Sequence, residues 1–277
     1  MRTLKLPSGQ LIPVLGMGTW RMGENALHRQ SEIDALRHGL DLGFSLIDTA
    51  EMYGEGGAEE VIAQAIANRR ESVFLVSKVY PHNASKQKAI AACERSLKRL
   101  KTDYLDVYLL HWRGSVPLAE TLEAFETLQQ SGKIRSYGVS NFDIEDMQEV
   151  SQLKGGKGIV TNQVLYNLMR RGIEWNLLPW CRQQNIPIMA YSPIEQGRLL
   201  NNKTIKAIAQ QRGVTAAQVA IAWLLHQEDI IVIPKSSRID HVEQNYAAKD
   251  LKLSAEELAA LDVAFPPPTK PVSLEML

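Results

Sequence analysis

The sequence predicts an α/β fold in which eight parallel strands alternate with helices and close into a barrel. Short apolar runs typical of strands recur eight times, and patterns with helical spacing separate them. Parallel neighbours need a crossover connection, so this alternation favours a parallel sheet. The length of 277 residues also matches a closed (β/α)8 TIM barrel. We therefore expect one barrel domain over residues 1–277.

The strands are expected in a regular order. Thr3–Leu6 and Leu11–Pro13 flank a turn and predict an N-terminal β-hairpin, which we expect at the floor of the barrel. The first barrel strand begins at Val14. The other seven are predicted at Ser45–Asp48, Val73–Lys78, Leu105–Leu110, Ile134–Ser140, Ile159–Gln163, Ile186–Tyr191 and Ile230–Lys235.

Helices are expected between these strands and at the C-terminus. Ala216–Leu225 is strongly apolar but too short to span a bilayer, so it predicts a buried helix. Ala255–Val263 predicts an extra C-terminal helix, which Pro266–Pro268 cannot continue. A doubly wound open sheet is the alternative fold, and it usually carries GxGxxG after its first strand. The nearest sequence, Gly54–Glu59, follows the second strand and has Glu in place of the third Gly.

Composition excludes several partners. Lysine plus arginine and aspartate plus glutamate each number 31, so the formal net charge is zero and predicts no nucleic-acid or anionic-membrane partner. Met1–Lys5 lacks the apolar region of a secretory signal. Cys93 and Cys181 lie far apart without metal-type spacing. We expect a cytoplasmic monomer without a membrane partner or a metal site.

Four polar side chains stand at or just after the carboxyl ends of predicted strands. Asp48 ends the second strand, and Tyr53 follows on the next loop. Lys78 ends the third strand, and His111 follows the fourth. Each alone has an ordinary explanation, such as a turn cap, a solvated cation or a core histidine. A barrel brings all strand ends to one face, where barrel enzymes build their active sites, so we expect the four to converge.

These groups suit carbonyl reduction by hydride transfer. Hydride addition leaves negative charge on the substrate oxygen, which then needs a proton. A free tyrosine has a pKa of about 10, and a lysine ammonium beside the phenol is expected to lower it. Asp48 would keep Lys78 charged, and a neutral His111 would polarise the carbonyl. Metal-dependent hydrolysis would need several His and carboxylate ligands at strand ends, where only one His stands.

Eight motifs occupy the strand ends and their loops: Gly16–Trp20, Asp48–Gly54, Val76–Lys78, Asp103–Trp112, Gly132–Asn141, Asn162–Gln163, Ala190–Pro193 and Ile233–Ser236. With them the chain resembles the aldo-keto reductase family nearly from end to end. It is most similar to short bacterial members that reduce methylglyoxal-like aldehydes. The resemblance implies an NADPH-dependent reductase of aldehydes, ketones or keto-sugars. Tyr53 would be its general acid, Lys78 and Asp48 the pair that tunes it, and His111 the orienting group.

The resemblance also implies the cofactor contacts. Residues after the fifth to seventh strands would hold the nicotinamide, the loop from Ser192 to Gly197 would cover the pyrophosphate, and residues near Lys235 would meet the adenosine 2′-phosphate. The full expected set is Gly18, Thr19, Trp20, Asp48, Ser140, Asn141, Gln163, Tyr191, Ser192, Pro193, Ile194, Gln196, Gly197, Lys235, Ser236, Arg238, His241, Gln244 and Asn245. The expected substrate pocket comprises Trp20, Tyr53, His111, Trp112 and Arg113.

Three features depart from the family pattern. His241 stands where many members have an arginine for the 2′-phosphate, so we expect NADPH to be preferred through Lys235, with some use of NADH. Arg113 stands where proline is usual, and we expect its charge to favour polar or anionic carbonyls. The tail after Pro268 is brief, so we expect a pocket open on one side.

Two other functions stay open. A regulatory barrel that binds the nucleotide with little turnover, as some relatives of the family do, would not need a general acid such as Tyr53. An aldolase would use Lys78 as a Schiff-base amine and would need it neutral, whereas Asp48 beside it is expected to keep it charged.

Overall fold

The structure is a computed structural model that describes residues 1–277. All eight predicted barrel strands are present. They are β3 (Met17–Gly18), β4 (Leu46–Asp48), β5 (Phe74–Val79), β6 (Leu105–Leu110), β7 (Ile134–Ser140), β8 (Ile159–Leu165), β9 (Ile188–Tyr191) and β10 (Ile230–Val232). The last strand is shorter than predicted because Pro234 has no N–H to donate to a ladder.

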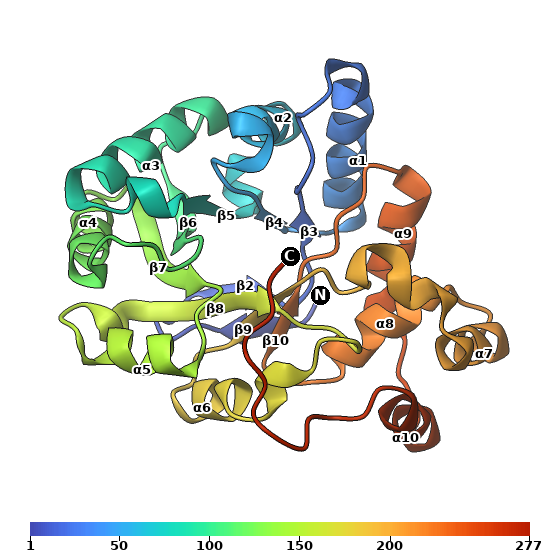
Figure 1. Ribbon diagram of the computed structural model, residues 1–277. Helices are drawn as coiled ribbons and strands as arrows, with labels where there is room; N and C mark the ends of the chain where they lie inside the picture. The colour runs from blue at the N-terminus through green and yellow to red at the C-terminus, as the bar shows by residue number, and fades with distance from the viewer.

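The sheet is parallel throughout and closes on itself. Its order is β10-β9-β8-β7-β6-β5-β4-β3. Isolated bridges between Leu15 and Val232 and between Gly18 and Lys235 join the two outer strands. The first strand was predicted from Val14, and backbone hydrogen bonds do link Val14 and Gly16 to Val232, although the regular strand begins only at Met17. The predicted (β/α)8 barrel is confirmed, with its helices arranged around the strands (Figure 1).

Nine helices surround the barrel, and a tenth follows. They are α1 (Arg29–Leu42), α2 (Gly57–Ala65), α3 (Lys86–Leu100), α4 (Leu118–Gln130), α5 (Ile144–Gln152), α6 (Leu177–Gln183), α7 (Lys203–Arg212), α8 (Ala216–Leu225), α9 (Ile239–Ala247) and α10 (Ala255–Ala264). Capping boxes at Thr215 and Ser254 begin α8 and α10, where each side-chain oxygen accepts a backbone N–H. No helix combines the length and apolar character needed to cross a membrane.

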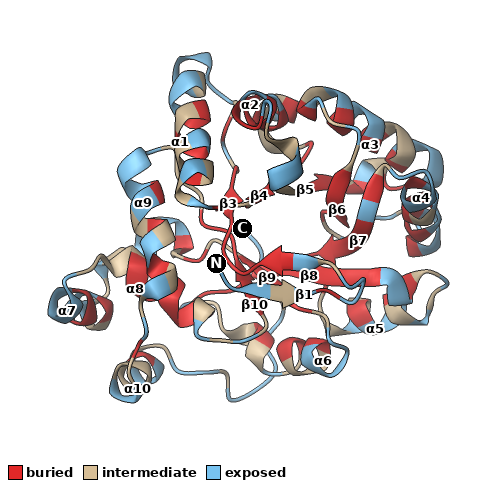
Figure 2. Ribbon diagram, turned by 180° about the vertical axis from the view of Figure 1, so that it is seen from behind, coloured by how far each residue is buried: buried red, intermediate tan, exposed pale blue.

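The N-terminal hairpin closes one end of the barrel. It pairs β1 (Thr3–Lys5) with β2 (Leu11–Pro13) in antiparallel register. Leu6 and Ile12 are buried in the same cluster as inward-facing strand residues such as Val107 and Met189. The predicted position at the barrel floor is confirmed. Seen from behind, the eight barrel strands are almost wholly buried, whereas the helices turn exposed faces outward (Figure 2).

The C-terminal tail crosses the opposite end. After α10 it runs back across β9 and β8 and ends near the centre of the barrel (Figure 1). Leu274 packs against the core, and Val272 lies 3.3 Å from the place that a Cβ on Gly172 would take. Glu275 pairs with Arg170. Even a brief tail thus reaches the mouth, because its side chains contact residues on the barrel rim. The expectation of a pocket open on one side stays a prediction.

Candidate active site

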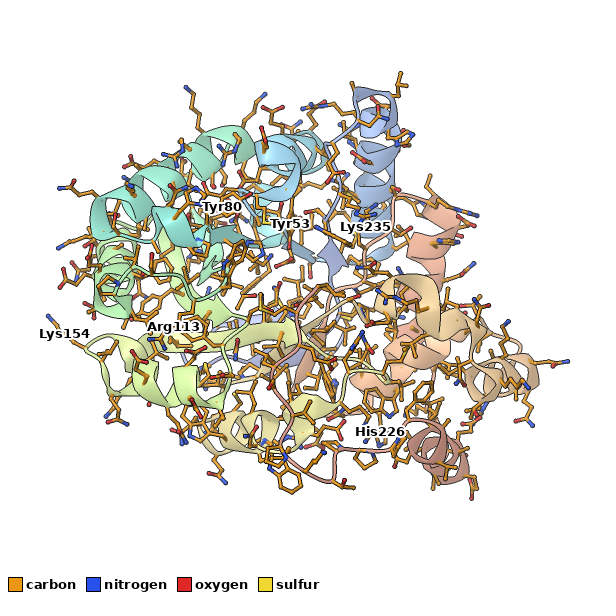
Figure 3. The ribbon with its side chains drawn as sticks, viewed as in Figure 1. Tyr53, Tyr80, Arg113, Lys154, His226 and Lys235 are labelled. Atoms are coloured by element: carbon orange, nitrogen blue, oxygen red, sulfur yellow. The ribbon has the colours of Figure 1, made fainter.

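Lys78 lies at the centre of the four residues expected to converge. Its Nζ donates to Asp48 Oδ2 at 2.8 Å, to the Thr49 carbonyl at 2.8 Å and to the Tyr53 hydroxyl at 3.3 Å. The ring centroids of Tyr53 and His111 are 5.8 Å apart. The strand ends of β4, β5 and β6 thus bring all four side chains together, and Tyr53 lies near the middle of the barrel in Figure 3.

Asp48 and Lys78 form a buried ion pair. The exposed fractions of these residues are 2% and 0%. Burial raises the pKa of Asp48 and lowers that of Lys78, and the attraction between the two charges opposes both shifts. The 2.8 Å contact between Lys78 Nζ and Asp48 Oδ2 favours the charged form of each group and so opposes the effect of burial. A Schiff-base amine must be neutral, so this attraction to Asp48 argues against the aldolase alternative.

The pKa of Tyr53 moves opposite to the expected direction. Burial raises the pKa of the phenol well above its ordinary value, and the negative charge of Asp48 adds to the rise. Desolvation disfavours a phenolate. The net shift of the Tyr53 pKa is therefore upward, and the expectation of a lowered pKa is wrong. Tyr53 keeps its proton at neutral pH, which is the form that a general acid requires.

His111 is neutral. Burial first, and the charge of Lys78 second, lower the pKa of the imidazole to about 2. Its Nδ1 atom is buried without a hydrogen-bond partner in the protein. A neutral imidazole can donate one N–H to a carbonyl oxygen without carrying charge into the site.

Two buried carboxylates that sequence reasoning missed hold this site in place. Glu51 accepts from the Tyr80 backbone N–H at 2.8 Å and so ties the loop before Tyr53 to the end of β5. Glu59 on α2 accepts from Ser77 Oγ at 2.7 Å and from Arg99 Nε at 2.6 Å. The burial of Glu59 could have been predicted from its position three residues before Ile62, because this spacing places both side chains on the apolar face of α2.

The residues expected at the nicotinamide form a connected network. Ser140 Oγ donates to the Gln163 carbonyl at 2.8 Å, and the Tyr191 hydroxyl donates to Asn141 Oδ1 at 2.9 Å. Gln163 Nε2 donates to Asp48 Oδ1 at 2.7 Å. Thr19, from the first strand, donates to the Asp48 carbonyl at 2.9 Å. The network lies at the carboxyl ends of β7, β8 and β9, directly beside the Asp48–Lys78 pair.

The loop expected at the pyrophosphate has an unusual backbone. Ser192, Gln196 and Gly197, together with Glu195, have φ between +49° and +93°, the left-handed region. Pro193 and Ile194 lie between them. Glu195 is fully buried and accepts from Asn167 Nδ2 at 2.8 Å. A buried carboxylate in the middle of a loop was not identified from the sequence, because its partners lie on other segments.

The cations expected at the 2′-phosphate lie at the far side of the mouth. Lys235 is half-buried beside Gly18, where Figure 3 labels it, and burial lowers the pKa of its ammonium. Arg238 is bound by Asp240, with Nε to Oδ1 at 3.1 Å and Nη2 to Oδ2 at 2.5 Å. His241 Nε2 lies 4.0 Å from the same carboxylate. Ser236 Oγ accepts from the Arg238 backbone N–H, and Gln244 and Asn245 lie on α9.

The expected substrate walls lie at two places on the rim. Trp112 packs against His111 with ring centroids 4.9 Å apart, and Trp20 carries the Arg21 guanidinium at 4.4 Å from its ring. Arg113 points to α5, where Nη1 donates to Asp146 at 2.5 Å and to Glu149 at 2.6 Å (Figure 3). Two carboxylates thus neutralise Arg113. These ion pairs on α5 leave less of its charge for a substrate, and the expectation that Arg113 favours anionic carbonyls stays a prediction.

Comparisons with known proteins agree with this arrangement. The sequence model of the Aldo/keto reductase family matches residues 14–264. Methylglyoxal reductase YeaE of Escherichia coli K12 is 55% identical over 271 residues, which cover 96% of this chain and 95% of the relative. Glyoxal reductase of Bacillus subtilis is 34% identical over 260 residues, covering 94% and 91%.

Solved structures agree as well. An aldo/keto reductase from Klebsiella pneumoniae, crystallised with NADP and acetate, is 52% identical and superposes with a TM-score of 0.97 over 99% of each chain. A second structure of a Klebsiella pneumoniae aldo-keto reductase, in complex with NADPH, has the same TM-score and identity and covers 100% of this chain and 99% of that one. The predictions of the family and of a carbonyl-reducing oxidoreductase are confirmed: the chain belongs to the aldo/keto reductase family.

Proposed function

We propose that this protein reduces small aldehydes and dicarbonyls of the methylglyoxal type to alcohols, with NADPH as hydride donor. The observation that carries the proposal is the buried chain from Asp48 through Lys78 to a protonated Tyr53, beside a neutral His111. The names of the relatives support the substrate class, since YeaE is a methylglyoxal reductase and the Bacillus relative a glyoxal reductase. The Klebsiella relatives support the cofactor.

The polar groups along the mouth suit NADPH. Amide and hydroxyl groups of Ser140, Asn141 and Gln163 lie at one end, beside the half-exposed ring of Tyr191. Cationic side chains lie at the other end, where Lys235 would hold a phosphate. This spread of hydrogen-bonding groups and cations matches a cofactor with an amide-bearing ring and a distant phosphate. When bound, the nicotinamide supplies a hydride to the carbonyl carbon.

The residues of this chain provide the proton and the orientation. Neutral His111 donates a hydrogen bond to the carbonyl oxygen and polarises it. Tyr53 then gives its proton to that oxygen, so that one hydride on carbon and one proton on oxygen yield the alcohol. The Lys78 ammonium, 3.3 Å away, stabilises the resulting phenolate. Asp48 keeps Lys78 charged and oriented.

The cofactor preference follows from the far end of the mouth. Lys235 supports NADPH over NADH, while Arg238 and His241 share the Asp240 carboxylate and offer less charge to a 2′-phosphate. The protein should therefore also reduce carbonyls with NADH at a measurable rate. We further propose a monomer in the cytoplasm that has neither a nucleic-acid nor a membrane partner. The two buried free cysteines are consistent with a reducing compartment.

The test is to follow nicotinamide absorbance with purified protein. NADPH and NADH are compared against methylglyoxal, an aromatic aldehyde and a keto-sugar, with Tyr53→Phe as control. Turnover with NADPH that is lost in the variant supports the proposal. Tight NADPH binding without reduction of any carbonyl would favour the regulatory barrel instead. Borohydride trapping of substrate on Lys78 would favour the aldolase.

A further inference from the structure

Arg170 joins two segments that are far apart in the sequence. Its Nε and Nη2 atoms donate to Glu195 Oε1 at 3.0 and 2.9 Å. Its Nη1 atom donates to Glu275 in the C-terminal tail. One guanidinium fork is thus shared between the loop Ser192–Gly197 and the last residues of the chain, a geometry that a lysine cannot reproduce.

The Glu195 side of this contact determines the shape of the loop. Both carboxylate oxygens of Glu195 are occupied, since Oε2 accepts from Asn167 Nδ2 at 2.8 Å. The same Asn167 amide also donates to the Ser192 carbonyl at 2.9 Å. Non-glycine residues at φ near +50° are strained and persist only where their surroundings hold them. The fully buried Glu195 is the side chain that holds this loop.

The Glu275 side determines where the tail lies. Glu275 stands between Leu274, which packs on the core, and the end of the chain. The backbone of Leu277 lies close enough to the Tyr191 hydroxyl to offset part of the rise that burial causes in its pKa. Tyr191 is the residue that immediately precedes the loop. Figure 1 shows the tail crossing the strand ends from which the loop leaves.

We propose that Arg170 is a positioning residue that couples the C-terminal tail to the loop Ser192–Gly197, so that a docked tail slows release of the nicotinamide cofactor. The inference rests on the proposed function and on the expectation from the sequence that this loop covers the pyrophosphate. Arg170 touches no reacting atom and acts through Glu195. Because such coupling is reciprocal, bound cofactor must also stabilise the docked tail.

The first experiment measures cofactor release. Stopped-flow fluorescence gives the NADPH dissociation rate of the full-length wild type, of Glu275→Gln and of Arg170→Lys. Glu275→Gln is expected to release NADPH about two- to fivefold faster, the range typical of a partly exposed ion pair. Arg170→Lys should do the same or more, because lysine cannot serve both carboxylates. Glu123→Gln is the matched control, since it removes a surface carboxylate paired with Lys86 at 3.1 Å, and its release rate should equal the wild type.

The second experiment tests reciprocity. Hydrogen exchange of residues 268–277 is followed with and without NADP+, and exchange in the barrel strands verifies folding of each variant. NADP+ should slow exchange in the tail of the wild type but not in that of Glu275→Gln. A wild type that binds no NADPH would overturn the proposed function together with this inference. Two results would overturn this inference alone. In one, the wild type binds NADPH but releases it at the same rate as Glu275→Gln. In the other, NADP+ does not change hydrogen exchange in the tail of the wild type.

Discussion

The ammonium of Lys78 lies 3.3 Å from the Tyr53 hydroxyl, although 25 positions separate the two residues in the chain. Before proton transfer, burial favours the neutral phenol. After transfer, the ammonium stands beside the phenolate and lowers its free energy. In the proposed mechanism, Tyr53 therefore holds its proton at neutral pH, and Lys78 stabilises the phenolate left when that proton passes to a substrate oxygen.

Replacement of Tyr53 tests this proton path. Tyr53→Phe keeps the ring and removes the acid, so kcat is expected to fall by roughly 10²- to 10⁴-fold, as for other general acids. The NADPH dissociation constant should stay unchanged, because the hydroxyl's partner in the protein is Lys78. Stopped-flow kinetics and fluorescence titration measure the two quantities. A variant with wild-type kcat would remove Tyr53 from the mechanism.

The pH profile of kcat/KM follows from the shifted pKa values. The pKa of Lys78 lies below its ordinary value of 10.5, whereas that of Tyr53 lies well above 10. On raising the pH, Lys78 loses its proton first, so activity should fall in the alkaline range below pH 10.5. The His111 pKa of about 2 predicts no histidine limb near neutrality. A titration near pH 6.5 that disappears in His111→Gln would contradict this account.

Asp240 is expected to weaken the preference for NADPH. Its carboxylate binds Arg238 and lies 4.0 Å from His241. Asp240 therefore reduces the positive charge that these two side chains can offer to a 2′-phosphate. Asp240→Asn should raise the ratio of kcat/KM for NADPH over NADH several-fold. Glu243→Gln on the same helix is the control, since Glu243 pairs with His38 on α1. The explanation fails if both variants change the ratio equally.

Arg113 is expected to act on all substrates alike. Because Asp146 and Glu149 neutralise its charge, Arg113→Ala should change KM for neutral and anionic carbonyls by the same factor. Its role is to tie the loop that carries Trp112 to α5. Steady-state kinetics with methylglyoxal and a keto acid decide the point. A selective loss for the keto acid would instead support the expectation that the charge of Arg113 favours anionic carbonyls.

Two neighbouring glutamates on α2 should differ in their effect on stability. Glu59 is fully buried and bound by Arg99 and Ser77, so Glu59→Ala is expected to lower the free energy of unfolding by about 3–5 kcal/mol. Glu60 pairs with Arg29 at the surface, and Glu60→Ala should cost about 0–1 kcal/mol. Urea unfolding measures both. Equal losses would show that burial does not decide the effect.

The sequence by itself determined the barrel and which residues could be grouped at its candidate active site. Apolar periodicity and chain connectivity are local signals, and they placed all eight strands and the floor hairpin. In a parallel barrel, the carboxyl ends of all strands lie at the same face. The sequence therefore predicted that Asp48, Lys78 and His111 lie close together.

Only the tertiary structure decided how these groups behave. The upward shift of the Tyr53 pKa depends on depth of burial, which the packing of distant segments determines. Two ion-pair arrangements depend on which charges the fold brings within reach. Arg113 pairs with Glu149 on α5, and Arg170 pairs with both Glu195 and Glu275. Electrostatic partners are non-local, and therefore a pattern along the chain can name the charged residues but not pair them.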